Sequence, residues 1–310
     1  MKKVLVTGAA GTVGRNVIKY LLSEGKYEIT ALDLKTSGNY HKLKRYKKRI
    51  NIIYGDVTDA TLIESLVKEM NYVIHLAGVS LPIGNLNYNL SYQIDYKGTE
   101  NIVRNIDFFN PECYLLYASS ASVYGNIGNR EEVSVSTKSN LSSKDYYSSV
   151  KLDAENLIKE KLKNYSIFRL PVILCNPIKE NYIYSYSPDA EIEVVTDTDA
   201  AYMFVKAIDK IDKVNKKTFN VGGGEHCRIT GKKLNEELIK VYGISRKYIN
   251  NKIFIDKNFY SYYFKDSDKL EEILQFRNDS IASYLMRAKR KVRKRKLQKL
   301  VGSIFIKNEK

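Results

Sequence analysis

Tyr147 and Lys151 are the two residues in this sequence whose types and spacing best suit proton transfer. They lie four positions apart in a segment with helical spacing, so both side chains project from one helix face. A free tyrosine, with a pKa of about 10, is a poor base at neutral pH, but a neighbouring ammonium group favours the phenolate. Such a phenolate can take a proton from a substrate hydroxyl while hydride leaves the carbon for a nicotinamide cofactor. The alternative is two solvated positions on a helix.

A glycine-rich stretch near the start of the chain could hold that cofactor. Gly8, Gly11 and Gly14 lie in TGAAGTVG, between an apolar run at 3–7 and a segment with helical spacing at 14–24. Glycines at a strand-to-helix turn let backbone N–H groups approach a pyrophosphate, and the helix N-terminus then faces the negative phosphates. This context favours a dinucleotide site over a set of ordinary turn glycines.

Asp33 indicates which dinucleotide. It lies 25 positions after Gly8, at the end of the second strand-like run. A carboxylate there can accept hydrogen bonds from the adenosine ribose hydroxyls and would repel a 2′-phosphate. The sequence therefore predicts NAD rather than NADP, although the nearby Lys35 weakens that preference.

Strands that alternate with helices must position these residues. Strands are expected at 3–7, 28–32, 50–54, 72–76, 113–118 and 166–170, and helices at 14–24, 61–70, 98–109 and 145–162. This alternation predicts an α/β fold with a Rossmann-type, doubly wound parallel sheet. After Pro171 the pattern is irregular, with strands expected at 191–195 and 218–221 and helices at 199–209 and 232–242. We expect an NAD-binding domain over 1–170 that carries the catalytic residues, and a small, shortened substrate lobe over 171–280 that returns strands to it.

The net charge of +16 is concentrated at the end of the sequence. Residues 281–310 contain eleven Lys or Arg and one acidic residue, so this segment carries +10 and residues 1–280 carry +6. Leu285, Val292 and Leu300 belong to an imperfect apolar stripe at helical spacing. A basic amphipathic helix of this kind can lie on an anionic membrane, and a solvated tail is the alternative. Nucleic acid is a weaker candidate because the basic run lacks interleaved aromatic residues.

The remaining composition is that of a protein from a reducing compartment. The cysteines (Cys113, Cys175 and Cys227) and histidines (His41, His75 and His226) are scattered and form neither a disulfide framework nor a metal-ligand spacing. No apolar run approaches the roughly 20 residues of a membrane span. We therefore expect a cytoplasmic protein without a metal, and His75 packed beside the cofactor.

Several segments resemble, in the expected order, those of the extended short-chain dehydrogenase/reductase family of the NAD-dependent epimerase/dehydratase type. They are residues 7–14, 55–58 (GDVT), 75–78 (HLAG), 95–101 (DYKGTEN) and 219–222 (FNVG), and the resemblance covers about residues 1–280. Asp95 stands where the family usually has Asn. The resemblance implies NAD as cofactor and these cofactor-binding residues: Gly8, Gly11, Thr12, Val13, Gly14, Asp33, Asp56, Val57, Leu76, Ala77, Gly78, Tyr147 and Lys151. We also expect a homodimer.

The segment YASSASVYG at 117–125 completes the expected catalytic set. In the family this segment supplies a hydroxyl that hydrogen-bonds the reacting oxygen, and the match assigns that role to Ser120 beside Tyr147 and Lys151. Family dehydratases have an Asp-Glu pair directly afterwards, whereas this chain has Ala121 and Ser122. The resemblance therefore favours a nucleotide-sugar epimerase, which needs only reversible hydride transfer and room for the keto-sugar to turn.

The substrate half of the sequence keeps other functions open. Family epimerases tend to have Arg-x-x-Asn where this chain has RLPV at 169–172, so the asparagine that touches the nucleotide-sugar is missing. The segment between Pro177 and Asp199 also looks too short for the helix that usually helps to hold a uridine diphosphate. The alternatives are an NAD(P)-dependent reductase or dehydrogenase of a smaller substrate, and a cofactor-binding protein with little catalysis.

Overall fold

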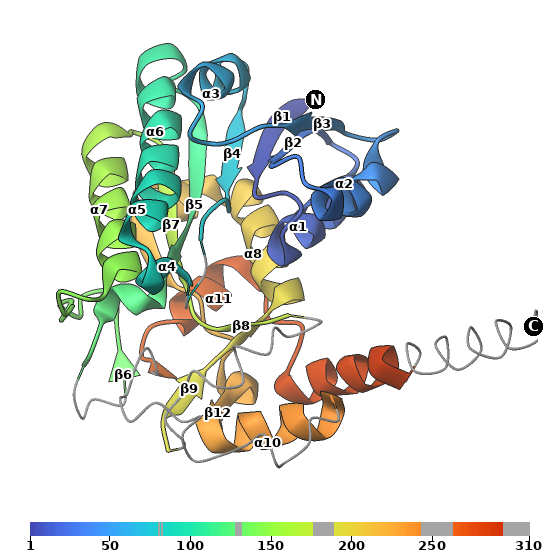
Figure 1. Cartoon of the computed structure of the whole chain (residues 1–310), viewed down its shortest axis with the longest axis vertical. Helices are drawn as coiled ribbons and strands as arrows, with labels where there is room; N and C mark the ends of the chain where they lie inside the picture. Colours follow the sequence, from blue (N-terminus) through green and yellow to red (C-terminus); the bar gives the residue numbers. More distant parts are fainter. Residues whose placement is uncertain (80, 82, 128–131, 176–188, 243–262, 294–310) are drawn as a thin grey trace, which may run out of the picture.

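A sheet of seven parallel strands forms the centre of the computed structural model (Figure 1). The structure describes residues 1–79, 81, 83–127, 132–175, 189–242 and 263–293. The strand order is β11-β7-β5-β4-β1-β2-β3, and every neighbouring pair is parallel. The strands are β1 (Lys2–Thr7), β2 (Tyr27–Asp33), β3 (Asn51–Tyr54), β4 (Tyr72–His75), β5 (Tyr114–Ser120), β7 (Tyr165–Leu170) and β11 (Lys217–Asn220).

Helices cover both faces of this sheet (Figure 1). α1 (Thr12–Glu24) and α8 (Asp197–Asp209) pack together on one face. α3 (Ala60–Val67), α6 (Gly98–Phe109) and α7 (Tyr146–Lys161) lie on the other. Parallel strands need crossover connections, and here the helices of these connections cover both faces. The Rossmann-type fold expected from the sequence is confirmed.

The central strands are apolar on both sides because both sides are covered. Val4 and Val6 of β1 belong to the core cluster on the α1 side, whereas Leu5 belongs to the cluster on the α3 side. All three side chains are fully buried. Successive side chains of a strand point to opposite faces, so an unbroken apolar run suits a strand between two helical layers.

The winding of the sheet reverses between β1 and β4. β2 and β3 lie on one side of β1, and β4, β5, β7 and β11 lie on the other. Thr7 and His75, the last residues of β1 and β4, are paired in register. The carboxyl ends of these two strands therefore form the switch point where open α/β sheets bind ligands.

A small lobe is built from the second half of the chain. β8 (Ile173–Leu174) pairs with β10 (Val195–Thr196), β9 (Glu191–Glu193) pairs with β12 (Arg228–Thr230), and α10 (Gly231–Tyr242) follows. The strand expected over 191–195 is thus two short strands. Val194 N donates to Cys227 O while Val195 N donates to Val172 O, so the chain changes partner at this point.

Residues 281–293 form a helix that lies beside α10 (Figure 1). Ile281, Tyr284 and Ala288 are buried in the same apolar cluster as Leu234 of α10. The sequence predicts a basic tail that begins at residue 281. Over 281–293 this segment is instead a packed part of the lobe, because its apolar side chains complete the lobe's core. The rest of the expected tail, residues 294–310, lies outside the described residues.

The shorter elements connect these layers. They are α2 (Ser37–Leu43), η1 (Lys44–Tyr46), α4 (Ile83–Leu86), α5 (Tyr88–Ser91), the π-helix η2 (Tyr92–Lys97), η3 (Ala121–Tyr124), β6 (Glu132–Val133), α9 (Ile211–Val214), η5 (Glu225–Cys227), β13 (Tyr263–Phe264) and α11 (Asp268–Leu274). In the part of the chain that is described, no helix is long and apolar enough to cross a bilayer.

Candidate active site

The turn between β1 and α1 has no room for side chains at two glycines. Gly8 has a φ of 65°, and a Cβ added there would lie 2.8 Å from backbone atoms of Leu76 and Ala77. A Cβ on Gly14 would collide with the carbonyl oxygen of Gly8. Gly11 N donates to Gly8 O at 3.0 Å and closes the turn. The backbone can therefore approach a pyrophosphate closely, as a dinucleotide site requires.

The start of α1 leaves its positive end free for an anion. Gly11 caps the helix without a side-chain hydrogen bond, and no acidic residue lies in the first turn. Thr12 and Val13 open the helix, and Val13 packs on the core below. The first N–H groups of a helix have no partner within it, and the helix dipole adds to their attraction for a phosphate. These residues fit NAD.

Asp33 is fixed at the edge of this turn. Its Oδ2 accepts from Ala10 N at 2.7 Å, and its Oδ1 accepts from Leu34 N and Asn39 Nδ2, both at 2.8 Å. The carboxylate is partly exposed at the end of β2, beside the glycine turn. It can therefore meet a ribose hydroxyl of a dinucleotide that lies on the turn.

Asp56 and Val57 line the same end of the sheet. Asp56 Oδ1 accepts from Thr58 N at 2.9 Å, and Val57 O accepts from Asn101 Nδ2 at 3.0 Å. A Cβ on Gly98 would lie 2.7 Å from Val57 Cγ2, so Gly98 lets α6 approach this loop. The two segments that resemble the family, GDVT and DYKGTEN, thus hold each other in place.

The segment after β4 is fixed by a buried chain of hydrogen bonds. Thr7 Oγ1 accepts from Leu76 N and Ala77 N at 3.2 Å and lies 2.7 Å from His75 Nδ1. His75 Nε2 lies 3.0 Å from Thr99 Oγ1. Burial lowers the pKa of His75 to about 3, so the imidazole is neutral near pH 7. His75 is a packed residue that orients the loop, as its apolar surroundings predict.

Lys151 lies in a buried polar site beside this loop. Its Nζ is 3.0 Å from Asp95 Oδ1, donates to Ala118 O at 3.2 Å and lies 5.0 Å from the ring centre of Tyr117. Burial lowers the pKa of Lys151, but Tyr117 and Asp95 outweigh it and the net shift is upward. A Cβ on Gly78 would lie 3.3 Å from Nζ. The ammonium group therefore stays charged next to the cofactor-facing loop.

Tyr147 lies next to this lysine on α7. Lys151 Nζ is 5.9 Å from the Tyr147 ring centre, and Tyr147 N donates to Asn85 Oδ1 at 2.9 Å. A Cβ on Gly84 would lie 2.8 Å from Tyr147 Cδ2, so Gly84 makes room for the ring. Burial raises the pKa of Tyr147 overall, while Lys151 and a hydrogen bond with Ser120 lower it. The structure thus brings together all three residues of the expected catalytic set.

The three neighbouring serines have different surroundings. Ser119 Oγ donates to Glu155 Oε1 at 2.6 Å and is part of a buried network with Arg169. Ser120 Oγ accepts from Ser122 N at 3.2 Å, and Ser122 is itself buried. The Ser120 hydroxyl lowers the pKa of Tyr147, so it lies close enough to act on the phenol. This favours Ser120 for the role that the sequence gives it.

A buried ion pair that the sequence analysis missed fixes α7 to the sheet. Glu155 accepts from Arg169 Nε at 2.9 Å and from Arg169 Nη2 at 2.8 Å. Burial raises the pKa of Glu155, but Arg169 more than offsets this and the net shift is downward. Glu155 lies four residues after Lys151, on the same face of the helix. The four-residue spacing of Lys151 and Glu155 is the sequence signal that could have placed Glu155 on the same helix face as the catalytic residues.

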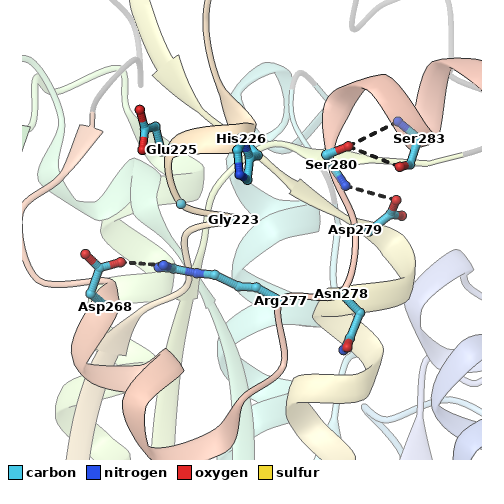
Figure 2. A pocket seen from close by; sticks show the side chains of 10 residues that line it. Gly223, Glu225, His226, Asp268, Arg277, Asn278, Asp279, Ser280 and Ser283 are labelled. Carbon is cyan, nitrogen blue, oxygen red and sulfur yellow. Dashed lines mark hydrogen bonds and ion pairs between the residues drawn. The ribbon is translucent and has the colours of Figure 1, made fainter.

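The C-terminal half of the chain contains a cavity that is separate from the predicted site residues. Among the described residues, no group of three His, Cys, Asp or Glu side chains could hold a metal ion. A cavity of about 550 Å³ lies in the C-terminal half, where Arg277 pairs with Asp268 beside His226 (Figure 2). Its lining includes none of the residues predicted for the cofactor or for catalysis.

A family model described as "NAD dependent epimerase/dehydratase family" matches residues 4–181. A dTDP-glucose 4,6-dehydratase of Mycolicibacterium smegmatis is 31% identical over 176 residues, which is 53% of this chain and 50% of that protein. A CDP-paratose 2-epimerase of Salmonella typhi is 28% identical over 131 residues, 40% of this chain and 38% of that protein. The chain spans half or less of the length of these two curated relatives.

Among solved structures, a UDP-glucuronic acid 4-epimerase from Bacillus cereus in complex with UDP-glucuronic acid and NAD has a TM-score of 0.77. It is 18% identical, and the match covers 94% of this chain and 99% of that one. At this identity the likeness supports the fold alone.

Proposed function

The chain belongs to the NAD-dependent epimerase/dehydratase family, and we propose that it is a nucleotide-sugar epimerase that works by transient hydride transfer. The observation that carries this proposal is the cluster of Ser120, Tyr147 and Lys151 next to the glycine turn at the switch point of the sheet. The cluster pairs an acid/base group with a site that fits a dinucleotide.

The residues of the cluster have separate tasks. Tyr147 takes the proton of a sugar hydroxyl and later returns it, and Ser120 holds the same oxygen by a hydrogen bond. Lys151 supplies a positive charge that stabilises the phenolate form of Tyr147. NAD, which the glycine turn and Asp33 would hold, would supply the acceptor for the hydride of the sugar carbon and a further positive charge beside Tyr147.

The positions after Ser120 support an epimerase rather than a dehydratase. Ala121 and Ser122 stand where family dehydratases have Asp and Glu, and both are buried at 4% and 2% exposure. They offer no carboxylate for the removal of water. An epimerase needs none, because reversible hydride transfer and rotation of the keto-sugar suffice.

The second candidate is a reductase or dehydrogenase of a smaller substrate. Val172 stands where family epimerases have an asparagine that touches the nucleotide-sugar, and it packs against the apolar core of the small lobe. A nucleotide would therefore have to be held by other groups. Residues 176–188, part of the segment judged too short for the usual helix, lie outside the described residues.

We further propose that the protein prefers NAD to NADP, forms a homodimer and acts in the cytoplasm, at the inner face of the membrane. Asp33 supports the cofactor preference. The membrane contact is supported by the 281–293 helix, whose Lys289, Arg290 and Lys291 are exposed while Tyr284 is buried. Basic residues near an anionic surface contribute on the order of 1 kcal/mol each.

A panel of UDP-, GDP- and dTDP-sugars tests the reaction. An epimerase converts one of them into its stereoisomer without net reduction of NAD. Accumulation of NADH with a keto product would favour the second candidate instead. If no sugar is converted and NAD still binds, the remaining alternative of cofactor binding with little catalysis applies.

A further inference from the structure

Asp95 is a buried carboxylate that faces Lys151. It lies in the π-helix η2 and has 0% exposure. Its Oδ1 is 3.0 Å from Lys151 Nζ, and its Oδ2 accepts from Val79 N at 3.2 Å. Its backbone carbonyl accepts from Thr99 Oγ1 at 2.5 Å, which ties it to the hydrogen-bond chain of His75.

The site is shaped to admit this carboxylate. A Cβ on Gly78 would collide with Asp95 Oδ1, so the loop after β4 leaves space for the acid at that position. A π-helix is rare, and it is often found at functional sites. Within the family resemblance an amide is the usual residue here, so the negative charge is a property of this chain.

Asp95 lies beside the ammonium group of Lys151, and the charge of this same ammonium group acts on Tyr147. A carboxylate 3.0 Å from Nζ offsets much of the positive field that Lys151 presents to the phenol. We propose that Asp95 is a positioning residue that holds Lys151 and weakens the positive charge beside Tyr147. This inference rests on the proposed role of Tyr147 as the acid/base group.

The other groups around the Tyr147–Lys151 pair come from two further elements. Tyr117 and Ser120 belong to β5, and His75 ends β4. His75 is neutral near pH 7, because burial lowers its pKa to about 3. Asp95 is thus the anionic group closest to this pair among the described contacts.

Replacement by the amide should change the acidity of Tyr147. Burial raises the pKa of Tyr147, Lys151 lowers it, and Asp95 raises it. Asp95→Asn keeps the shape and an acceptor for Val79 N but removes the charge. We expect the pKa of Tyr147 to fall by about 1 unit, the lower end of the effect of a nearby charge. The pH dependence of turnover should move to lower pH by the same amount.

The experiment is a pH titration of the NAD-saturated full chain labelled with ¹³Cζ-tyrosine, followed by NMR. Tyr147→Phe identifies the Tyr147 signal. Asp199→Asn is the matched control, since Asp199 is also a buried carboxylate (2% exposed) but lies in α8 on the other face of the sheet. It should leave the Tyr147 titration where the wild type has it.

The outcomes separate this inference from the proposed function. A downward shift in Asp95→Asn with none in Asp199→Asn supports the inference. No shift, or an upward one, overturns it, and Asp95→Ser gives the same test if Asp95→Asn does not fold. Turnover by Tyr147→Phe would instead overturn the proposed function. A purely structural Asp95 would lower stability without moving the Tyr147 signal.

Discussion

Gly8→Ala tests the close approach between the glycine turn and the loop after β4. Gly8 and Gly25 both have a left-handed backbone, with φ of 65° and 68°. A Cβ at Gly8 would lie 2.8 Å from the backbone of Leu76 and Ala77, whereas a Cβ at Gly25 meets nothing within 4 Å. The two glycines thus share the same backbone strain and differ in the space around them.

This difference sets the expected magnitudes. An alanine in a left-handed conformation costs about 1 kcal/mol, and this should be the whole effect of Gly25→Ala. Gly8→Ala adds a collision with backbone that cannot rotate away, and overpacking of this kind costs about 1–3 kcal/mol more. We therefore expect Gly8→Ala to destabilise the protein by about 2–4 kcal/mol.

Thermal unfolding and calorimetry with NAD measure both consequences. Gly25→Ala should lower the melting temperature by a few degrees and keep the NAD affinity of the wild type. Gly8→Ala should lower the melting temperature at least twice as far and weaken NAD binding strongly, since the turn is displaced. Equal melting temperatures and equal NAD affinities in the two variants would refute the proposed geometry of the turn.

Three further predictions follow from the described contacts. Asp33→Ala should weaken NAD binding and bring the affinities for NAD and NADP closer together in calorimetry. If the wild type binds NADP more tightly than NAD, the proposed role of Asp33 is wrong. Burial raises the pKa of Asp199 from 3.8 to about 6, so the folded state binds the proton more tightly and this carboxyl lowers stability as pH rises from about 4 to about 6. The melting temperature of Asp199→Asn should therefore lose this contribution to its pH dependence in that range, and an unchanged profile would show that Asp199 does not titrate this way. Replacing Lys289, Arg290 and Lys291 together by Glu should keep the fold, because these side chains are exposed, and should weaken sedimentation with anionic vesicles. Equal sedimentation of this variant and the wild type would end the membrane proposal.

The glycine turn and the parallel sheet could be predicted because their signals are local. Gly8, Gly11 and Gly14 lie within one strand-to-helix junction, and the apolar runs alternate with amphipathic helices along the chain. The ion pair of Lys151 with Asp95 joins residues that are distant in sequence, and only the packing of η2 against α7 brings them together. No local pattern carries that information.

The end of the chain shows a different limit. Ile281, Tyr284 and Ala288 have the i, i+3, i+7 spacing of a buried helix face. The basic residues that follow them favoured the prediction of a helix on an anionic membrane instead. A helix stripe alone does not tell whether its partner is lipid or protein. Here the 281–293 helix packs on the apolar face of α10, and no pattern in the sequence indicates that these two helices are partners.

Tyr147→Phe tests the central claim most directly, with Tyr146→Phe as its control. Tyr146 is the adjacent tyrosine, is 36% exposed, and lies against Tyr88 with ring centres 5.4 Å apart. With a sugar converted by the wild type, we expect Tyr147→Phe to bind NAD normally and lose turnover by a factor of at least about 100, the usual contribution of an acid/base group. Tyr146→Phe should keep the turnover of the wild type. Full turnover by Tyr147→Phe would contradict the account.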